Sequence, residues 1–259
     1  MNKTLTQDNY FEDKRLSSSK LKAYIACPNY YNWKYVENEE ELLTDALVFG
    51  KAVDCLVTTP DKFKDQFEVA KGARKDGKFI DGKHILTTTQ YEAANLMSNK
   101  ILAQPIMQEM FLKWEKQKIL VNDECKAMLD FFTVDHDKRE GSFADLKTCA
   151  DINKFSAQMV TYGYYFQMAF YRKMCRLLYP KIKRWKIYII AVDKSSSMRF
   201  KVFKVIQTKL KHYDTQIENA LDSLWIGDER KLSPGLCVKC PPQLNCPYSL
   251  FKVNHIEKI

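Results

Sequence analysis

Residues 128–149 decide the fold, and they read MLDFFTVDHDKREGSFADLKTC. Apolar, β-branched and aromatic side chains recur towards both ends, whereas residues 135–141 in the middle are polar and end in glycine. This pattern is typical of two strands joined by a turn. Asp145 and Lys147 are two residues apart on the second strand, so their side chains point to the same face. We expect the turn to bring Asp130, in the apolar run of the first strand, alongside them.

Two carboxylates and a lysine at one place support a specific chemistry. Carboxylate oxygens are ligands of hard divalent cations such as Mg²⁺. The cation acidifies a water molecule and polarises a phosphate, and the lysine orients that water or stabilises developing negative charge. The alternative is a solvated strand face with a surface ion pair, which contributes little to stability.

A helix predicted over residues 164–178 adds two further candidates. Gln167 and Tyr171 are four residues apart, so they share one helical face. Both side chains can hydrogen-bond a phosphate or the catalytic lysine. Alternatively, Tyr171 is a core aromatic residue and Gln167 a surface residue.

The rest of the pattern indicates an α/β or α+β protein. Further helices are predicted over residues 44–57, 88–104, 152–159 and 208–224, and strands over 118–121, 125–134, 142–148, 185–192 and 200–205. We divide the chain into a flexible lead-in and a single domain with three parts. These are residues 1–15 for the lead-in, then 16–112 (helical), 113–225 (catalytic core) and 226–259 (cysteine-rich tail).

Composition excludes several classes of protein. The chain has 259 residues, of which 46% are hydrophobic and 13% aromatic, so it is too apolar to be disordered. The apolar stretches are far shorter than the roughly 20 residues of a membrane-spanning helix, and residues 1–15 contain no apolar signal segment. We therefore expect a cytoplasmic protein without a membrane partner. The net charge of +9 favours a polyanionic partner such as DNA.

Taken together, these residues resemble the PD-(D/E)xK nuclease superfamily, and most of all the RecE-like exonucleases of phage and prophage recombination. The matching positions are Asp130, Asp145-Leu146-Lys147, Gln167 and Tyr171. Upstream, residues 47–54 read LVFGKAVD and match the family's Gly-x-x-x-His element, with Asp54 where many members carry His. A carboxylate at that position can still bind a metal ion.

The resemblance implies a fold, a set of metal ligands and a reaction. The fold is the restriction-endonuclease-like core, with a mixed central sheet flanked by helices and a helical N-terminal part. One or two Mg²⁺ or Mn²⁺ ions would lie on Asp130, Asp145 and the backbone carbonyl of Leu146, with Asp54 as an additional candidate ligand. Lys147 would position water, and the Gln–Tyr pair would contact DNA or support the lysine.

The implied reaction is exonucleolytic resection of linear duplex DNA, from 5′ to 3′, for recombination by single-strand annealing. Implied partners are linear DNA ends, an annealing protein and further copies of the chain, in a bacterial or phage-infected cell. The alternative is a catalytically inactive DNA-binding accessory protein that keeps the nuclease fold. The unusual Asp54 favours the alternative, whereas the intact Asp130, Asp145 and Lys147 favour the enzyme.

Three of the eight cysteines crowd near the C-terminus, as Cys237, Cys240 and Cys246. Thiolates select iron–sulfur clusters or zinc, and three of them need a fourth ligand from elsewhere. Cys27, in ACPNYYNW, is the candidate. One Cys-Pro before the core and three cysteines after it resemble the AddB-type iron–sulfur nucleases, which implies a structural [4Fe–4S] cluster. Zinc and free thiols are the alternatives, and the absence of a G-x-G-x-x-G loop disfavours an iron–sulfur oxidoreductase.

A basic segment, residues 71–83, is predicted to be an exposed loop. Its cations are candidates for contacts with DNA phosphates. The candidate residues are Lys71, Arg74, Lys75 and Lys78. The alternative is an ordinary solvated face.

Overall fold

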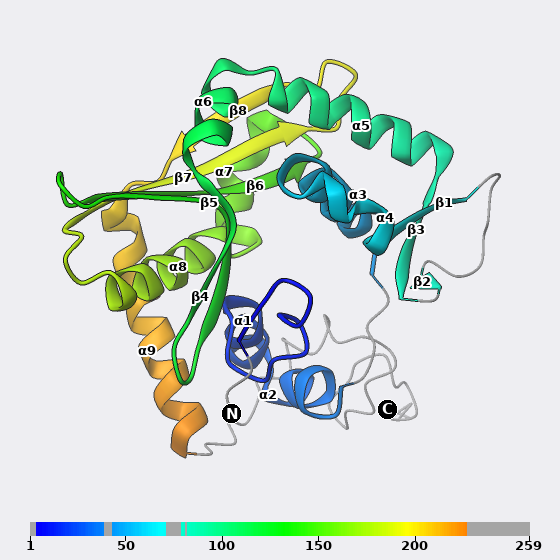
Figure 1. The fold of residues 1–259 in the computed structure, drawn as a ribbon. Coiled ribbons are helices and arrows are strands. Elements are labelled where there is room, and N and C mark those ends of the chain that lie inside the picture. The colour runs from blue at the N-terminus through cyan, green and yellow to red at the C-terminus, as the bar shows by residue number, and fades with distance from the viewer. Residues whose placement is uncertain (1–3, 39–42, 71–78, 81, 227–259) are drawn as a thin grey trace, which may run out of the picture.

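A five-stranded mixed sheet runs through the protein, shown as a computed structural model in Figure 1. The structure describes residues 4–38, 43–70, 79–80 and 82–226. The strands lie in the order β4 (Glu115–Val121), β5 (Lys126–Asp135), β6 (Glu140–Cys149), β7 (Arg184–Asp193) and β8 (Phe200–Lys204). β6 and β7 are parallel and the other neighbours are antiparallel. The mixed α/β fold predicted from the sequence is therefore confirmed.

Helices cover both faces of this sheet (Figure 1). One face is packed by α1 (Ser18–Ala26), α7 (Phe155–Thr161), α8 (Tyr164–Leu178) and α9 (Lys211–Ile226). The other is packed by α3 (Asp45–Thr58), α5 (Thr88–Leu102) and α6 (Pro105–Lys113). Shorter helices are α2 (Pro28–Tyr31), η1 (Asn32–Val36), η2 (Pro60–Lys62), α4 (Phe63–Gln66), η3 (Ile152–Lys154) and η4 (Gln207–Leu210).

The central strands separate two hydrophobic cores, because successive side chains of a strand point to opposite faces. On β6, Phe143 belongs to the core beneath α8, and Ala144 belongs to the core beneath α3. On β7, Ile189 likewise belongs to the core beneath α8, and Ile190 belongs to the core beneath α3. Both faces of these strands are thus buried, which explains the continuous apolar run of β7.

The parallel pairing of β6 with β7 requires a crossover, and α7 and α8 form it. α8 begins after Gly163, whose φ of +64° is a left-handed conformation that glycine adopts without strain. The bounds of α8 coincide with the prediction. This crossover places the face of α8 that carries Gln167 against β6.

A small second sheet was not predicted. It contains β1 (Phe67–Ala70), β3 (Lys83–Thr87) and β2 (Phe79–Ile80), in that order. The prediction of a loop over residues 71–83 is therefore wrong at its C-terminal end, where β2 and the first residue of β3 lie. These strands are too short to show a period-of-two pattern in the sequence. They are stabilised by packing on α5 and α3.

The N-terminal segment from residue 4 to residue 15, predicted to be part of a flexible lead-in, is held by two buried lysines. Lys126 Nζ donates to the carbonyl of Asp13 at 2.7 Å. Lys20 Nζ donates to the same carbonyl at 3.1 Å. A buried ammonium needs such acceptors, so both lysines tie this segment to α1 and β5. Within the described part of the chain, no helix has the length and apolar character needed to cross a membrane.

Asp193, at the end of β7, organises the turn towards β8. Its fully buried carboxylate accepts hydrogen bonds from Arg199 Nε at 2.7 Å, Arg199 N at 3.0 Å and Ser195 Oγ at 2.5 Å. Burial alone would raise the pKa of Asp193, but these hydrogen bonds lower it to about 2. The charged carboxylate is therefore the form that the folded protein stabilises.

We expect Asp193→Asn to lower the free energy of unfolding at pH 7 by about 1.5–3 kcal/mol, the usual contribution of hydrogen bonds to a charged group. Because the folded pKa lies below the unfolded value, this stability is present above about pH 4 and is lost as the pH falls towards 2. Urea unfolding of Asp193→Asn and of wild type at pH 7 and at pH 3 measures the difference in their free energies of unfolding at each pH. Asp137→Asn, at an exposed turn position, is the control. Equal differences between Asp193→Asn and wild type at the two pH values would contradict the account.

Candidate active site

Three aspartates and a lysine meet where β5 and β6 separate. The ladder between these strands ends at the pair Phe131–Ala144. Beyond it, Asp130 Oδ2 accepts the N–H of Leu146 at 2.7 Å, in place of a backbone carbonyl of β5. The carboxylate of Asp130 thus lies where the ladder would continue, beside the residue that follows Asp145.

Asp145 and Lys147 lie on one face of β6, as predicted, and form an ion pair. The side chain of Asp145 is only 2% exposed, whereas that of Lys147 is 21% exposed. The lysine head group also lies 5.4 Å from the ring centroid of Tyr164 at the start of α8. The carboxylate of the ion pair is therefore buried, while part of the lysine side chain remains exposed.

α8 supplies Gln167 and Tyr171 from the next layer. Gln167 Nε2 donates to Asp145 Oδ1 at 3.1 Å and to the Tyr171 hydroxyl at 2.8 Å. The predicted pair thus reaches the site through Asp145, and no hydrogen bond joins it to Lys147 in the described residues. Tyr171 is 8% exposed and packs edge-on against Phe143, so it is also a core aromatic residue.

Asp54 reaches the same place from α3, on the other side of the sheet. Its Oδ2 accepts a hydrogen bond from Gln117 Nε2 at 3.3 Å, while its Oδ1 is buried without any hydrogen-bond partner. Gln117 Nε2 also donates to Thr58 Oγ1 at 3.0 Å and lies 3.4 Å from Asp130 Oδ1. One amide therefore links the carboxylates of α3 and β5.

The electrostatics of the site reflect three carboxylates crowded out of water. Burial, together with the weaker effect of Asp145, raises the pKa of Asp54 to about 7, against the opposing effects of Lys147 and Gln117. Burial and the other two aspartates raise the pKa of Asp130 well above its usual value. For Lys147, attraction to Asp145 and Asp130 outweighs burial, so its pKa is raised and the ammonium is retained.

This arrangement fits a divalent cation. A buried carboxylate oxygen without a donor, such as Asp54 Oδ1, is costly unless a cation or a proton neutralises it. Oxygen donors are what Mg²⁺ and Mn²⁺ bind. In the part of the chain that the structure describes, the His, Cys, Asp and Glu side chains form no ready-made group of three metal ligands. Instead, the carboxylates are occupied by Gln117, Gln167, Lys147 and the N–H of Leu146.

Comparison with known families agrees with this geometry. A sequence model for a family described as a PDDEXK-like domain of unknown function (DUF3799) matches residues 17–242. The chain belongs to this family. No curated protein matches the sequence.

A solved structure shows the same fold as this PDDEXK-like domain. A crystal structure of a candidate exonuclease from Eubacterium rectale superposes with a TM-score of 0.67 at 19% identity, over 89% of each chain. A second structure, of SSO0001, has 12% identity and a TM-score of 0.30, over 61% of this chain and 78% of that one. The second similarity is too low to add information about the fold.

The predicted cysteine set and basic loop of the PDDEXK-like domain lie mostly outside the described residues. This applies to Cys237, Cys240, Cys246, Lys71, Arg74, Lys75 and Lys78. Cys27 is described: it is 4% exposed, and its Sγ accepts the N–H of Tyr30 at 3.3 Å as the N-cap of α2. The other described cysteines are buried.

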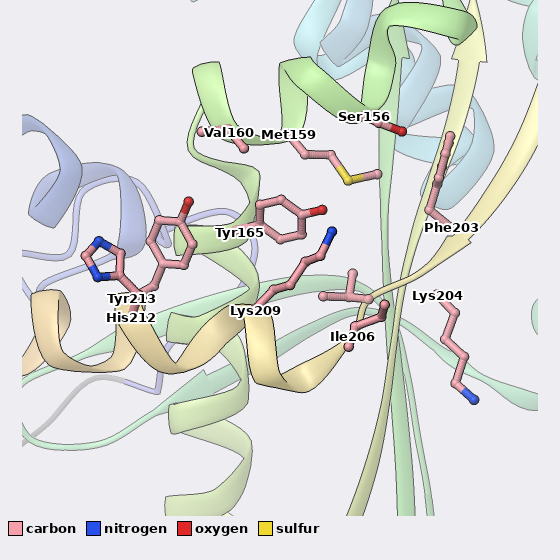
Figure 2. A pocket seen from close by; sticks show the side chains of 11 residues that line it. Ser156, Met159, Val160, Tyr165, Phe203, Lys204, Ile206, Lys209, His212 and Tyr213 are labelled. Atoms are coloured by element: carbon pink, nitrogen blue, oxygen red, sulfur yellow. The ribbon is translucent and has the colours of Figure 1, made fainter.

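A hollow in the described surface lies apart from the carboxylate site. This cavity of about 510 Å³ lies between α7, the end of β8 and α9, and Figure 2 shows the side chains that line it. Its lining includes Val160, Tyr165, Ile206, Lys209 and Tyr213, and none of the three aspartates. The candidate active site is thus defined by its side chains and not by this cavity.

Gln117, a site residue that the sequence analysis missed, has a strained backbone. It lies on β4 opposite Asp130, between the paired residues Lys116–Phe131 and Lys118–Leu129. Its φ of +49° is uncommon for a residue other than glycine, and the side chain is 7% exposed. Such strain persists where surrounding contacts impose it, and here it directs the amide towards Asp54 and Asp130.

We expect Gln117→Leu to lower the free energy of unfolding of the metal-free protein by about 1–3 kcal/mol, because buried carboxylate oxygens lose their donor. Chemical unfolding in EDTA measures the change. Gln108→Leu, at an exposed position of α6, removes an amide without burying a vacant acceptor and is the control. Equal stability of Gln117→Leu and wild type would show that the amide does not hold the carboxylates.

Proposed function

We propose that this protein is a metal-dependent nuclease that hydrolyses phosphodiester bonds of DNA. The observation that carries the proposal is the meeting of Asp54, Asp130 and Asp145 with Lys147 where the ladder between β5 and β6 ends. Family membership supports it, because the family is described as PDDEXK-like. So does the net charge of +9, which suits a polyanionic substrate.

The residues have separate roles in this proposal. Asp130, Asp145, the Leu146 carbonyl and Asp54 would hold Mg²⁺ or Mn²⁺, which when bound supplies an acidified water and polarises the phosphate. Lys147 keeps its proton beside Asp145 and offers positive charge to the phosphate.

Two residues of α8 support the metal ligands from behind. Gln167 fixes the orientation of Asp145 through its amide, and the Tyr171 hydroxyl fixes Gln167. Holding a ligand from behind in this way preserves its geometry for the metal ion.

At a finer level, we propose exonucleolytic resection of linear duplex DNA from 5′ to 3′, for phage-type recombination by single-strand annealing in the cytoplasm. The RecE-like arrangement of residues 130–171 supports this role. An annealing protein and further copies of the chain are the proposed partners. Incubation with linear and covalently closed circular DNA tests it: loss of linear DNA alone from its 5′ ends is expected. Equal cleavage of the circle would exclude an exonuclease.

The alternative is a DNA-binding accessory protein without turnover. Asp54, which replaces the histidine of many relatives and is buried with an unpartnered oxygen, is the observation that favours it. The two functions differ in one result, since the accessory protein binds linear DNA and leaves it intact in every metal.

We further propose a [4Fe–4S] cluster on Cys27, Cys237, Cys240 and Cys246, with zinc as the alternative. Cys27 is the one ligand of this set in the described residues, and it is buried beside α1.

Cys240→Ser is expected to remove absorption near 400 nm, roughly where iron–sulfur proteins absorb, and to destabilise the fold. Spectra of anaerobically purified protein test this, with Cys175→Ala, at a buried cysteine of α8, as the control that keeps the absorption. An unchanged spectrum of Cys240→Ser would remove that residue from the ligand set, and bound zinc without colour would favour the alternative.

A further inference from the structure

A second lysine, Lys22, approaches the candidate active site from α1. α1 packs against α8, and the half-buried Lys22 Nζ lies 3.5 Å from the carbonyl of Tyr162, just before α8 begins. The Lys147 head group lies 5.4 Å from the ring centroid of Tyr164 in the first turn of α8, so the contacts of Lys22 with Tyr162 and Gly163 place it at the same end of this helix. Lys22 therefore belongs to the same electrostatic environment as the ion pair on β6, although it lies far away in the sequence.

The backbone before α8 leaves room for this side chain. A Cβ atom at Gly163 would lie 3.0 Å from Lys22 Cδ, closer than ordinary van der Waals contact. Gly163 also has a positive φ, so two independent constraints favour glycine there. Gly163 thus leaves space for Lys22 beside the start of α8, the helix that carries Gln167.

The positive charge of Lys22 has no carboxylate of its own. In the described part of the chain, no aspartate or glutamate forms an ion pair with it, and Asp145 is already paired with Lys147. Burial and repulsion by Lys147 lower the pKa of Lys22 to about 8. Two ammonium groups at one site are stabilised by an anion between them, and the proposed substrate carries one phosphate per nucleotide.

We propose that Lys22 is a phosphate-binding residue of the active site, which acts with Lys147 on the backbone of the DNA strand being cleaved. This inference rests on the proposed nuclease function and adds a substrate contact from the N-terminal helix. It assigns to α1 a role in holding DNA, in addition to covering the sheet.

The test is the salt dependence of DNA binding in EDTA, where cleavage does not interfere. Affinity for a short fluorescein-labelled duplex is measured between about 50 and 200 mM salt. One lost phosphate contact lowers the slope of log K against log[salt] by about 0.7–0.9. Lys22→Met is expected to show that loss and weaker binding, whereas Lys22→Arg keeps the wild-type slope.

The control is Lys181→Met, which removes an exposed lysine near the start of β7. The nearby ion pair of Arg184 with Glu140 remains intact in this variant. Its slope is expected to equal that of wild type. A wild-type slope for folded Lys22→Met would overturn the Lys22 proposal, even if the protein cleaves DNA. Absence of DNA binding by wild type would overturn the proposed function and this inference together, so the two failures are distinguishable.

Discussion

Replacing Lys147 with alanine is expected to reduce the rate of DNA cleavage at least about 100-fold, the usual effect of removing one group that stabilises a developing charge. Lys147 is the cation that faces both Asp145 and Asp130 and keeps its proton there. Its side chain is 21% exposed, whereas that of its partner Asp145 is 2% exposed. Without it, the developing negative charge loses the cation nearest to the carboxylates of Asp145 and Asp130.

Folding should survive this change, because the Lys147 side chain is partly exposed and belongs to neither hydrophobic core, and DNA binding should weaken only by the loss of one phosphate contact. Single-turnover cleavage, circular dichroism and a binding assay measure the three properties on one preparation. Lys154→Ala, at an exposed position of η3, is the matched control and should cleave at the wild-type rate. Full activity of Lys147→Ala would show that the site is wrongly assigned.

The second large effect is on stability, at Gly141 of β6. A Cβ atom there would lie 2.6 Å from Cε3 and 2.7 Å from Cη2 of the Trp185 side chain. Trp185 is 3% exposed and is held by the rings of Phe132 and Tyr179, at centroid distances of 6.0 and 6.2 Å. Because the indole cannot move away freely, we expect Gly141→Ala to cost about 3 kcal/mol or more.

Thermal or urea unfolding measures this cost. Gly50→Ala in α3 is the control, since a Cβ there would lie 3.2 Å from Thr148 Oγ1, which a small shift relieves. Alanine also gains about 1 kcal/mol of helix propensity over glycine, so Gly50→Ala should be nearly neutral. Equal stability of both variants would contradict the packing of Trp185 on β6.

Much of the fold could be predicted because its pattern is local. β5, β6 and α8 follow from alternation and helical spacing, and the N-cap Thr87 begins α5 with a capping box formed with Gln90. The small sheet of β1–β3 could not be predicted, since its short strands are stabilised by contacts distant in the sequence.

The same division holds for the candidate site. Asp145, Lys147, Gln167 and Tyr171 could be predicted, because strand and helix periodicity alone places each pair on one face. The partners that depend on tertiary structure could not be. Nothing local shows that Gln117 bridges α3 and β5, or that Lys22 reaches β6. Gln117 lies among the polar residues 115–118, just before the strand predicted over residues 118–121, so no local signal distinguished it.

The most direct test is the release of nucleotides from end-labelled linear duplex DNA by wild-type protein, with Mg²⁺ or Mn²⁺ and with EDTA. The account predicts metal-dependent loss of the label, abolished in Asp145→Asn, which keeps the size of the side chain and removes its charge. Intact DNA in every metal, with folded protein shown to bind it, would contradict a catalytic role for this site and favour the accessory protein.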